Sequence, residues 1–144
     1  MKNLKQLSVF IENRPGALSE ACRVLKSANV NILSMSVADT REFGILRLLL
    51  NDTAKGSEAL KAAGFIAREN HVLAVAVPDC AGGLAGVFEK TDELQLSVEY
   101  MYAIPSAKTD KAVIIFRFDD QADAADKLAA AGVELLSADD ICRG

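Results

Sequence analysis

Residues 12–18, Glu-Asn-Arg-Pro-Gly-Ala-Leu, decide the fold of this chain, because residues 78–84, Pro-Asp-Cys-Ala-Gly-Gly-Leu, repeat their pattern. Each stretch follows an apolar run typical of a strand, contains a turn-forming loop and leads into a helical pattern. Identical residues continue the match at one constant separation, from 16 to 82: Val9 and Val75, Gly16 and Gly82, Leu18 and Leu84, Met35 and Met101. The chain therefore contains the same strand, loop and helix start twice.

Further along, the two copies stay matched at a separation that is two residues longer, from 64 to 132. The identical pairs here are Asp52 and Asp120, Ala54 and Ala122, Leu60 and Leu128, Ala62 and Ala130, Ala63 and Ala131, and Gly64 and Gly132. A single change of separation, placed in a turn, is typical of a duplicated domain. We predict one domain in residues 1–70 and a second in residues 71–144. Halves of about seventy residues have little stability alone, so we expect them to pack on one another.

Hydrophobic periodicity predicts the order βαββαβ in each copy. The strands of the first copy are predicted around 7–12, 32–38, 44–50 and 65–68, and its helices follow Pro15 and end at Asn29 and Gly64. The second copy is predicted to have strands at 72–77, 96–103, 112–118 and 133–136, and helices at 83–91 and 122–131. Two right-handed βαβ crossovers place both helices on one face of an antiparallel sheet. The fold class is therefore α+β, with two ferredoxin-like domains in tandem and their sheets side by side.

Three details of the elements follow from local chemistry. Pro15 suits the first helical position, where its missing N–H costs nothing. The first helix should bury one apolar stripe, made of Leu18, Ala21, Cys22, Leu25 and Ala28. Near the C-terminus, Ser137 and Asp140 have the spacing of a capping box.

Composition excludes several classes of function. The chain has 144 residues, 51% of them hydrophobic, and a formal charge of −4, which disfavours nucleic acid as a partner. No run is long and apolar enough to span a membrane, and no signal-peptide core follows the N-terminus, so we expect a cytoplasmic protein. Cys22, Cys80 and Cys142 are widely spaced and His71 is the one histidine, so neither a disulfide framework nor a metal site is predicted. We expect no cofactor.

The loops are the places where a ligand is expected. Gly16 allows a backbone to approach closely, and the helix that follows presents N–H groups and the positive end of its dipole, which suit a carboxylate. The alternative is that glycine and proline serve the turn geometry alone.

Residues 12–18, followed after one helix by Ala-Asn-Val-Asn-Ile at 28–32, resemble the ACT domain family. These small regulatory modules bind amino acids in enzymes such as phosphoglycerate dehydrogenase and aspartokinase, and the resemblance covers the whole chain as two tandem copies. In the serine-sensing members, one loop asparagine and one asparagine at the second strand bind the effector; these match Asn13 and Asn31. Ile11 stands where those members have a histidine, so the resemblance does not assign serine as the ligand.

In the second copy the matching positions are Asp79 and Ser97, and Cys80 and Ala81 replace the Arg-Pro pair. The family's sites form between domains, which pairs Asn13 with Ser97 and Asp79 with Asn31. The resemblance thus implies a ligand site made of Asn13, Arg14, Pro15, Gly16, Ala17, Leu18, Asn31, Ile32, Asp79, Cys80, Gly82, Gly83, Leu84 and Ser97. An asparagine amide offers both a donor and an acceptor, which suits a zwitterion. An Asx-turn that only caps the loop remains open for Asn13 and Asp79.

The function expected from these residues is that of a sensor. It binds a small amino acid between ACT-like domains and passes that state to a partner enzyme or regulator; a homodimer is left open. The alternative is a regulatory or scaffold subunit that holds a partner without sensing a ligand. We expect no enzyme activity and assign no catalytic residue, because the sequence has no nucleophile and base pair, metal cluster or phosphate-binding motif. Cys80 lacks a predicted base, and Tyr100 and Tyr102 are expected to pack against the sheet or to line a ligand pocket.

Overall fold

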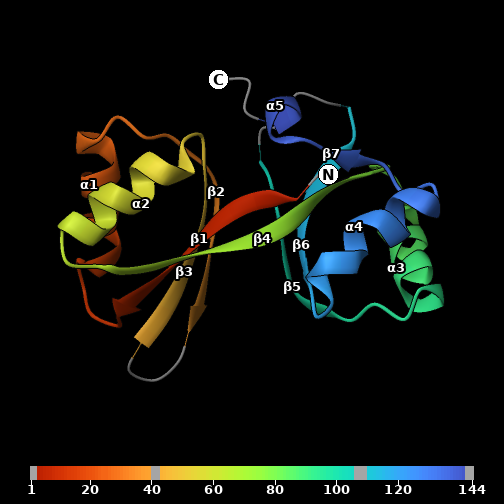
Figure 1. Cartoon of the computed structure of the whole chain (residues 1–144), viewed down its shortest axis with the longest axis horizontal. Helices are drawn as coiled ribbons and strands as arrows, with labels where there is room; N and C mark the ends of the chain where they lie inside the picture. The colour runs from red at the N-terminus through yellow and green to blue at the C-terminus, as the bar shows by residue number, and fades with distance from the viewer. Residues whose placement is uncertain (1–2, 40–42, 106–109, 142–144) are drawn as a thin grey trace. The chain divides into compact units, whose positions relative to one another are not determined.

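The computed structural model describes residues 3–39, 43–105 and 110–141 and divides into two compact units. The first unit is Lys5–Asn70, and the second runs from His71 onward and includes Asn3 and Leu4. The elements, labelled in Figure 1, are β1 (Leu4–Glu12), α1 (Ala17–Ser27), β2 (Ile32–Asp39), β3 (Phe43–Leu50), α2 (Thr53–Ala62), β4 (Ile66–Val77), α3 (Gly83–Glu93), β5 (Val98–Ala103), β6 (Ala112–Phe118), α4 (Gln121–Ala130), β7 (Leu135–Leu136) and α5 (Ala138–Ile141).

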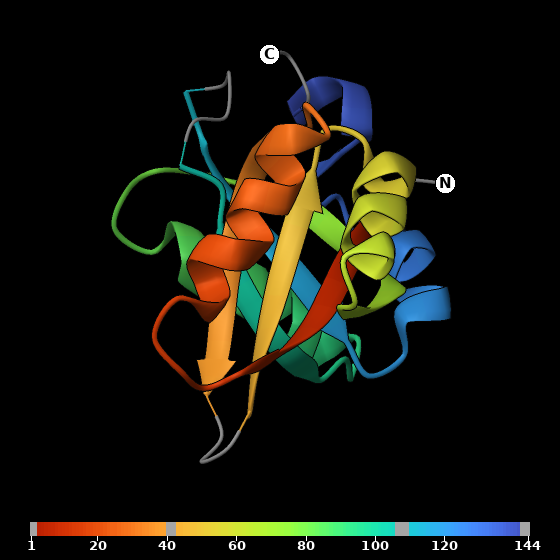
Figure 2. The ribbon, with the colours of Figure 1, turned by 90° about the vertical axis from the view of Figure 1, so that its left-hand side faces the viewer.

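The first unit is a sheet with strand order β2-β3-β1-β4, in which β3 pairs antiparallel with both β1 and β2. Helices α1 and α2 lie on one face of this sheet, in front of the strands in Figure 2. Alternation along the strands sends every second side chain into the core beneath the helices. That core contains Leu7, Val9, Ile11, Ala21, Leu25, Leu46, Leu48, Leu50 and Leu60.

The second unit repeats this plan with the order β4-β6-β5, and the short β7 pairs with β4. Helices α3 and α4 supply Val87 and Leu128 to its core. The ring of Phe116 stacks on that of Phe118 at 5.5 Å between centroids and meets Phe88 edge-on at 6.1 Å. Each unit thus has the order βαββαβ, so the predicted α+β, ferredoxin-like tandem fold is confirmed.

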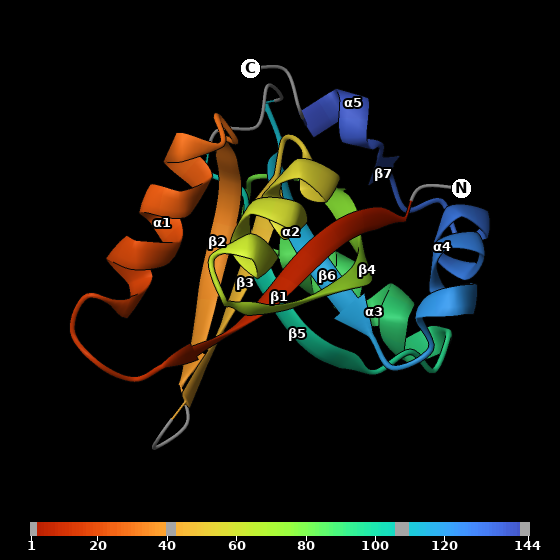
Figure 3. The same cartoon turned by 60° about the vertical axis from the view of Figure 1, so that its left-hand side comes forward.

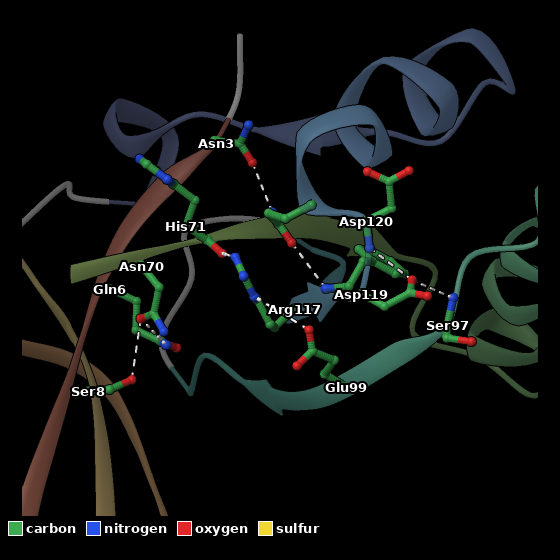
Figure 4. A network of polar contacts seen from close by, with 12 residues as sticks. Asn3, Gln6, Ser8, Asn70, His71, Ser97, Glu99, Arg117, Asp119 and Asp120 are labelled. Atoms are coloured by element: carbon green, nitrogen blue, oxygen red, sulfur yellow. Dashed lines mark hydrogen bonds and ion pairs between the residues drawn. The ribbon is translucent and has the colours of Figure 1, made fainter. Parts of the chain in front are cut away.

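One strand, β4, replaces the two separate strands predicted at 65–68 and 72–77. The polar residues in the middle of this strand predict a junction, but they have partners that hold them extended. The Oδ1 atom of Asn70 accepts hydrogen bonds from Gln6 Nε2 at 3.0 Å and from Ser8 Oγ at 3.3 Å. The carbonyl of His71 accepts one from Arg117 Nη1 at 2.8 Å (Figure 4). Figure 3 shows β4 as one continuous arrow that follows α2.

The helix ends repeat between the units in backbone detail. Asn29 and Gln95 both adopt a left-handed conformation, with φ of 58° and 56°. After α2 and α4, Gly64 and Gly132 do the same with φ of 93° and 85°, as expected for glycine just beyond a helix. The capping box is confirmed too: Ser137 N–H donates to Asp140 Oδ2 at 2.8 Å, and Asp140 N–H donates to Ser137 Oγ at 3.4 Å.

Candidate functional site

The two predicted ligand loops share one backbone conformation. In the first, Ala17 N–H donates to the carbonyl of Arg14 at 3.3 Å; in the second, Gly83 N–H donates to the carbonyl of Cys80 at 3.0 Å. The third turn residues, Gly16 and Gly82, have φ/ψ of 87°/−12° and 84°/−5°. The second turn residues, Pro15 and Ala81, do not have a positive φ, so both turns are of type II, whose third position requires a positive φ. The duplicated sequence pattern therefore encodes a duplicated turn.

Pro15 occupies the second position of its turn, and the prediction that it begins the helix is wrong. Helix α1 begins at Ala17, with Gly16 as its N-cap. Proline is favoured at the second position of a type II turn because its ring fixes φ near −65°. The proline therefore marks the turn that precedes the helix, and not the first helical residue.

Both helix starts lack a side-chain cap, and both loops are open above the glycine. Gly16 and Gly82 are the N-caps, and glycine has no side chain that could accept a hydrogen bond from the helix N–H groups. A Cβ atom built on either glycine would meet nothing within 4 Å. The N–H groups that remain without a partner at the start of a helix attract carboxylates and other anions. This arrangement can accept an anionic group but does not by itself select one.

The side chains around the first loop are charged. Arg14 donates from Nε to Glu12 Oε2 at 3.1 Å and from Nη2 to Glu20 Oε2 at 2.8 Å. The hydrogen bond to Glu20, supported by the one to Glu12, raises the pKa of Arg14 above its usual value. All three side chains are exposed, so the ion pairs add little stability but fix where the guanidinium lies.

The prediction that Leu18 belongs to the buried stripe of the first helix is wrong. Its side chain is 41% exposed, whereas Ala17, Ala21 and Leu25 are buried. Because α1 begins at Ala17, positions one and two helical turns later face the sheet. Leu84, the equivalent residue of the second unit, is half-buried and packs against the core of that unit.

The starts of the second strands are also equivalent. Asn31 N–H donates to Asn51 Oδ1 at 2.9 Å, and Asn51 N–H donates to the carbonyl of Asn31 at 3.1 Å. Ser97 and Asp119 make the same two bonds at 3.1 and 3.0 Å (Figure 4). Ile32, which follows Asn31, packs against the core of the first unit.

Within one unit, the structure does not bring the loop and the strand start together. Asn13 precedes α1 and Asn31 follows it, and a helix of eleven residues is about 16 Å long. Helix α3 separates Asp79 from Ser97 in the same way. The pairing of Asn13 with Ser97 and of Asp79 with Asn31 therefore stays a prediction.

Two hollows of the first unit adjoin predicted residues. One, of about 460 Å³, lies at the end of α1 and is lined by Cys22, Leu25, Lys26, Asn29, Val30, Asn31, Ile32 and Asn51. The other, of about 270 Å³, lies beside the loop and is lined by Phe10, Ile11, Glu12, Arg14, Ala17, Glu20, Phe43, Ala63, Gly64, Phe65 and Ile66. Sequence reasoning missed most of the second set, because it comes from three separate segments. The one available signal was aromatic residues at both Phe10 and Phe43, near strand ends.

Cys80 is exposed and forms no disulfide, and Tyr100 and Tyr102 are half-buried on β5. Among residues 3–39, 43–105 and 110–141, no group of three or more metal-binding side chains gathers. Within the same ranges, no helix combines the length and apolar character that crossing a membrane requires.

Comparison with known proteins places this geometry in a family. Protein BT0572 from Bacteroides thetaiotaomicron has a similar crystal structure, with a TM-score of 0.90 and 32% sequence identity over 99% of this chain and 97% of that one. The regulatory subunit of aspartate kinase from Thermus thermophilus, in its ligand-free form, has a TM-score of 0.65 and 14% identity over 92% of both chains. The corresponding subunit from Thermus flavus has a TM-score of 0.60 and 13% identity over 92% of this chain and 94% of that one. No curated protein matches the sequence.

The sequence itself is matched from residue 2 to residue 143 by the family described as an ACT domain pair. The match spans both copies of the βαββαβ order and both glycine turns. The chain belongs to the ACT domain pair family.

Proposed function

We propose that this protein is a regulatory sensor that binds a small amino acid through its glycine turns and the neighbouring strand starts. The observation that carries the proposal is the turn that both units share, with uncapped helix N–H groups and open space above the glycine. A carboxylate is the ligand group that such a helix start favours. The amides of Asn13 and Asn31 can each donate and accept, as an amino-acid zwitterion requires.

The amino-acid-bound state would act on a partner enzyme in the cytoplasm. ACT domain pairs are regulatory modules, and two proteins with this fold are regulatory subunits of aspartate kinase. We extend to this chain the role of a regulatory partner, without assigning the enzyme.

A second candidate is a scaffold that holds a partner and senses nothing. It is favoured by Met35 and Val37, two exposed apolar side chains on β2, the edge strand of the first unit. Exposed apolar residues on an edge strand are common in protein interfaces.

A thermal-shift screen of the twenty amino acids separates the two candidates. A ligand that binds only the native state stabilises it by about 2.7 kcal/mol at a hundredfold excess over its Kd, which raises the melting temperature measurably. The sensor predicts a rise with at least one amino acid at millimolar concentration. No rise with any of them would favour the scaffold.

A further inference from the structure

The hollow beside the first loop has an apolar wall that is open to solvent. Phe10, Phe43 and Ile66 line it and are 38%, 52% and 63% exposed. They come from β1, β3 and β4, and Phe43 lies directly opposite Glu12 in the sheet. Large apolar side chains gathered around a concave surface are characteristic of ligand sites. At about 270 Å³, this cavity lies near the lower limit of such sites, which suits a ligand of amino-acid size.

The same cavity has a charged wall with both signs. Arg14 lies between Glu12 and Glu20, and each carboxylate receives one of its N–H groups. A guanidinium has five N–H donors, so three remain after these two bonds. The lining contains two carboxylates and one cation, and the guanidinium of Arg68 lies 6.0 Å from the centroid of the Phe10 ring. The wall can therefore receive an ammonium group at a glutamate and a carboxylate at Arg14.

The second unit provides an internal comparison, because it lacks this set of side chains. Phe10, Glu12, Arg14 and Glu20 are matched by Ala76, Pro78, Cys80 and Gly86. Phe43 and Ile66 are matched by Lys111 and Glu134, whose side chains form an ion pair of 2.7 Å between Nζ and Oε1. A solvent-exposed ion pair therefore occupies these two positions in the second unit, which has the same fold. The fold does not require an exposed phenylalanine and isoleucine there.

We propose that this cavity of the first unit binds a free α-amino acid with a large apolar side chain, such as leucine or phenylalanine. The side chain packs against Phe10, Phe43 and Ile66, the ammonium pairs with Glu12 or Glu20, and the carboxylate binds Arg14. This inference rests on the proposed function and specifies its ligand class. It also assigns the binding residues to the first unit alone. Arg14 belongs to the predicted ligand loop, whereas Phe10, Phe43 and Ile66 lie outside the set of residues that the family resemblance implies.

Titration calorimetry of the full chain with L-leucine, L-phenylalanine, L-serine and glycine tests the ligand class. We expect leucine or phenylalanine to bind at least tenfold more tightly than serine and glycine, because only they bury apolar surface in the cavity. N-acetyl-L-leucine lacks the ammonium charge and 3-methylbutylamine lacks the carboxylate. Each should bind at least tenfold more weakly than leucine.

The double variant Phe43→Lys, Ile66→Glu tests the place, since it installs the pair that the second unit already uses. It should weaken leucine or phenylalanine binding at least tenfold while circular dichroism stays unchanged. The matched control, Lys111→Ala with Glu134→Ala, changes the equivalent positions of the other unit and should leave binding unchanged. Arg14→Gln does not alter the apolar wall and should also weaken binding tenfold. It tests the place of binding if the double variant fails to fold.

The outcomes separate this inference from the proposed function. If serine or glycine binds as tightly as leucine and phenylalanine, this inference is overturned and the sensor remains. The same holds if apolar amino acids bind the double variant and Arg14→Gln as tightly as they bind the wild-type chain. If no amino acid binds the wild-type chain, both are overturned.

Discussion

Asn31 and Asn51 are joined by two reciprocal hydrogen bonds, one through the side chain of Asn51 at 2.9 Å and one between their backbones at 3.1 Å. Ser97 and Asp119 repeat the pair with a carboxylate in place of the amide. The residue after the third strand of each unit thus fixes where the second strand begins. The side-chain acceptor is common to both pairs, whereas the amide donor is not.

Asn51→Ala should therefore lower the free energy of unfolding by about 1 kcal/mol, because the N–H of Asn31 loses its acceptor. Asn51→Asp keeps an acceptor, as Asp119 does in the second unit, and should change stability by less than about 0.5 kcal/mol. Urea unfolding of the two variants measures the difference. Equal losses from both would mean that the amide group of Asn51 contributes a second interaction.

The glycines of the second loop should differ sharply in their tolerance of a side chain. Gly83→Ala would drive its Cβ into the backbone carbonyl of Pro78, which cannot move without shifting the end of β4. We expect a loss of about 3 kcal/mol. Gly82→Ala meets no neighbour and has only the strain of φ near 84°, about 1–2 kcal/mol.

Gly86→Ala is the control for these two changes. It lies within α3, and a Cβ there meets nothing within 4 Å, so the change should stabilise the protein by about 0.5–1 kcal/mol. Chemical unfolding should rank the three variants with Gly86→Ala the most stable and Gly83→Ala the least. A Gly83→Ala variant as stable as Gly82→Ala would contradict the close approach of Pro78.

The sequence predicted the fold well because its signals were local. Gly16, Gly64 and their equivalents in the second copy mark turns with a positive φ, which few other residues adopt. Because these glycines recur at matching positions, the elements predicted for one copy could be assigned to the other. The continuity of β4 was missed because the partners of Asn70 and His71, namely Gln6 and Arg117, are distant in sequence. Without those partners, the run of polar residues in the middle of β4 is typical of a loop.

The candidate site was predictable only in part for the same reason. The turns at Gly16 and Gly82 follow from consecutive residues, whereas the apolar wall near Arg14 joins the ends of β1 and the starts of β3 and β4. Side chains from three segments meet there only after the sheet has formed. A pattern read along the chain has no means to group Phe43 with Ile66.

The ion pair of Lys111 and Glu134 predicts a measurable titration. The hydrogen bond from Lys111 to Glu134 raises the pKa of the lysine above its usual 10.5. A raised pKa means that the pair's contribution to stability is complete below the unfolded-state pKa and is lost as the pH rises through the folded-state pKa. Glu134→Gln should lower the pKa of Lys111 and weaken this alkaline dependence. NMR titration of the lysine Cε resonance measures the shift, and an unchanged pKa would show that the pair does not persist in solution.

The last prediction uses the difference between Asn13 and Asp79, the equivalent residues of the two loops. If the amide of Asn13 contacts an amino-acid zwitterion, Asn13→Ala should weaken binding by about 1–3 kcal/mol, because polar groups of the ligand lose their partner in the site. Asp79→Asn should have no effect or strengthen binding, since it removes a charge that repels a carboxylate and keeps an acceptor for the loop. Titration calorimetry with the amino acid identified by the thermal screen measures both, and unfolding curves check that the turns survive. Small and equal effects would mean that the two side chains only cap their loops, in which case the turn backbone and Arg14 would have to provide the recognition.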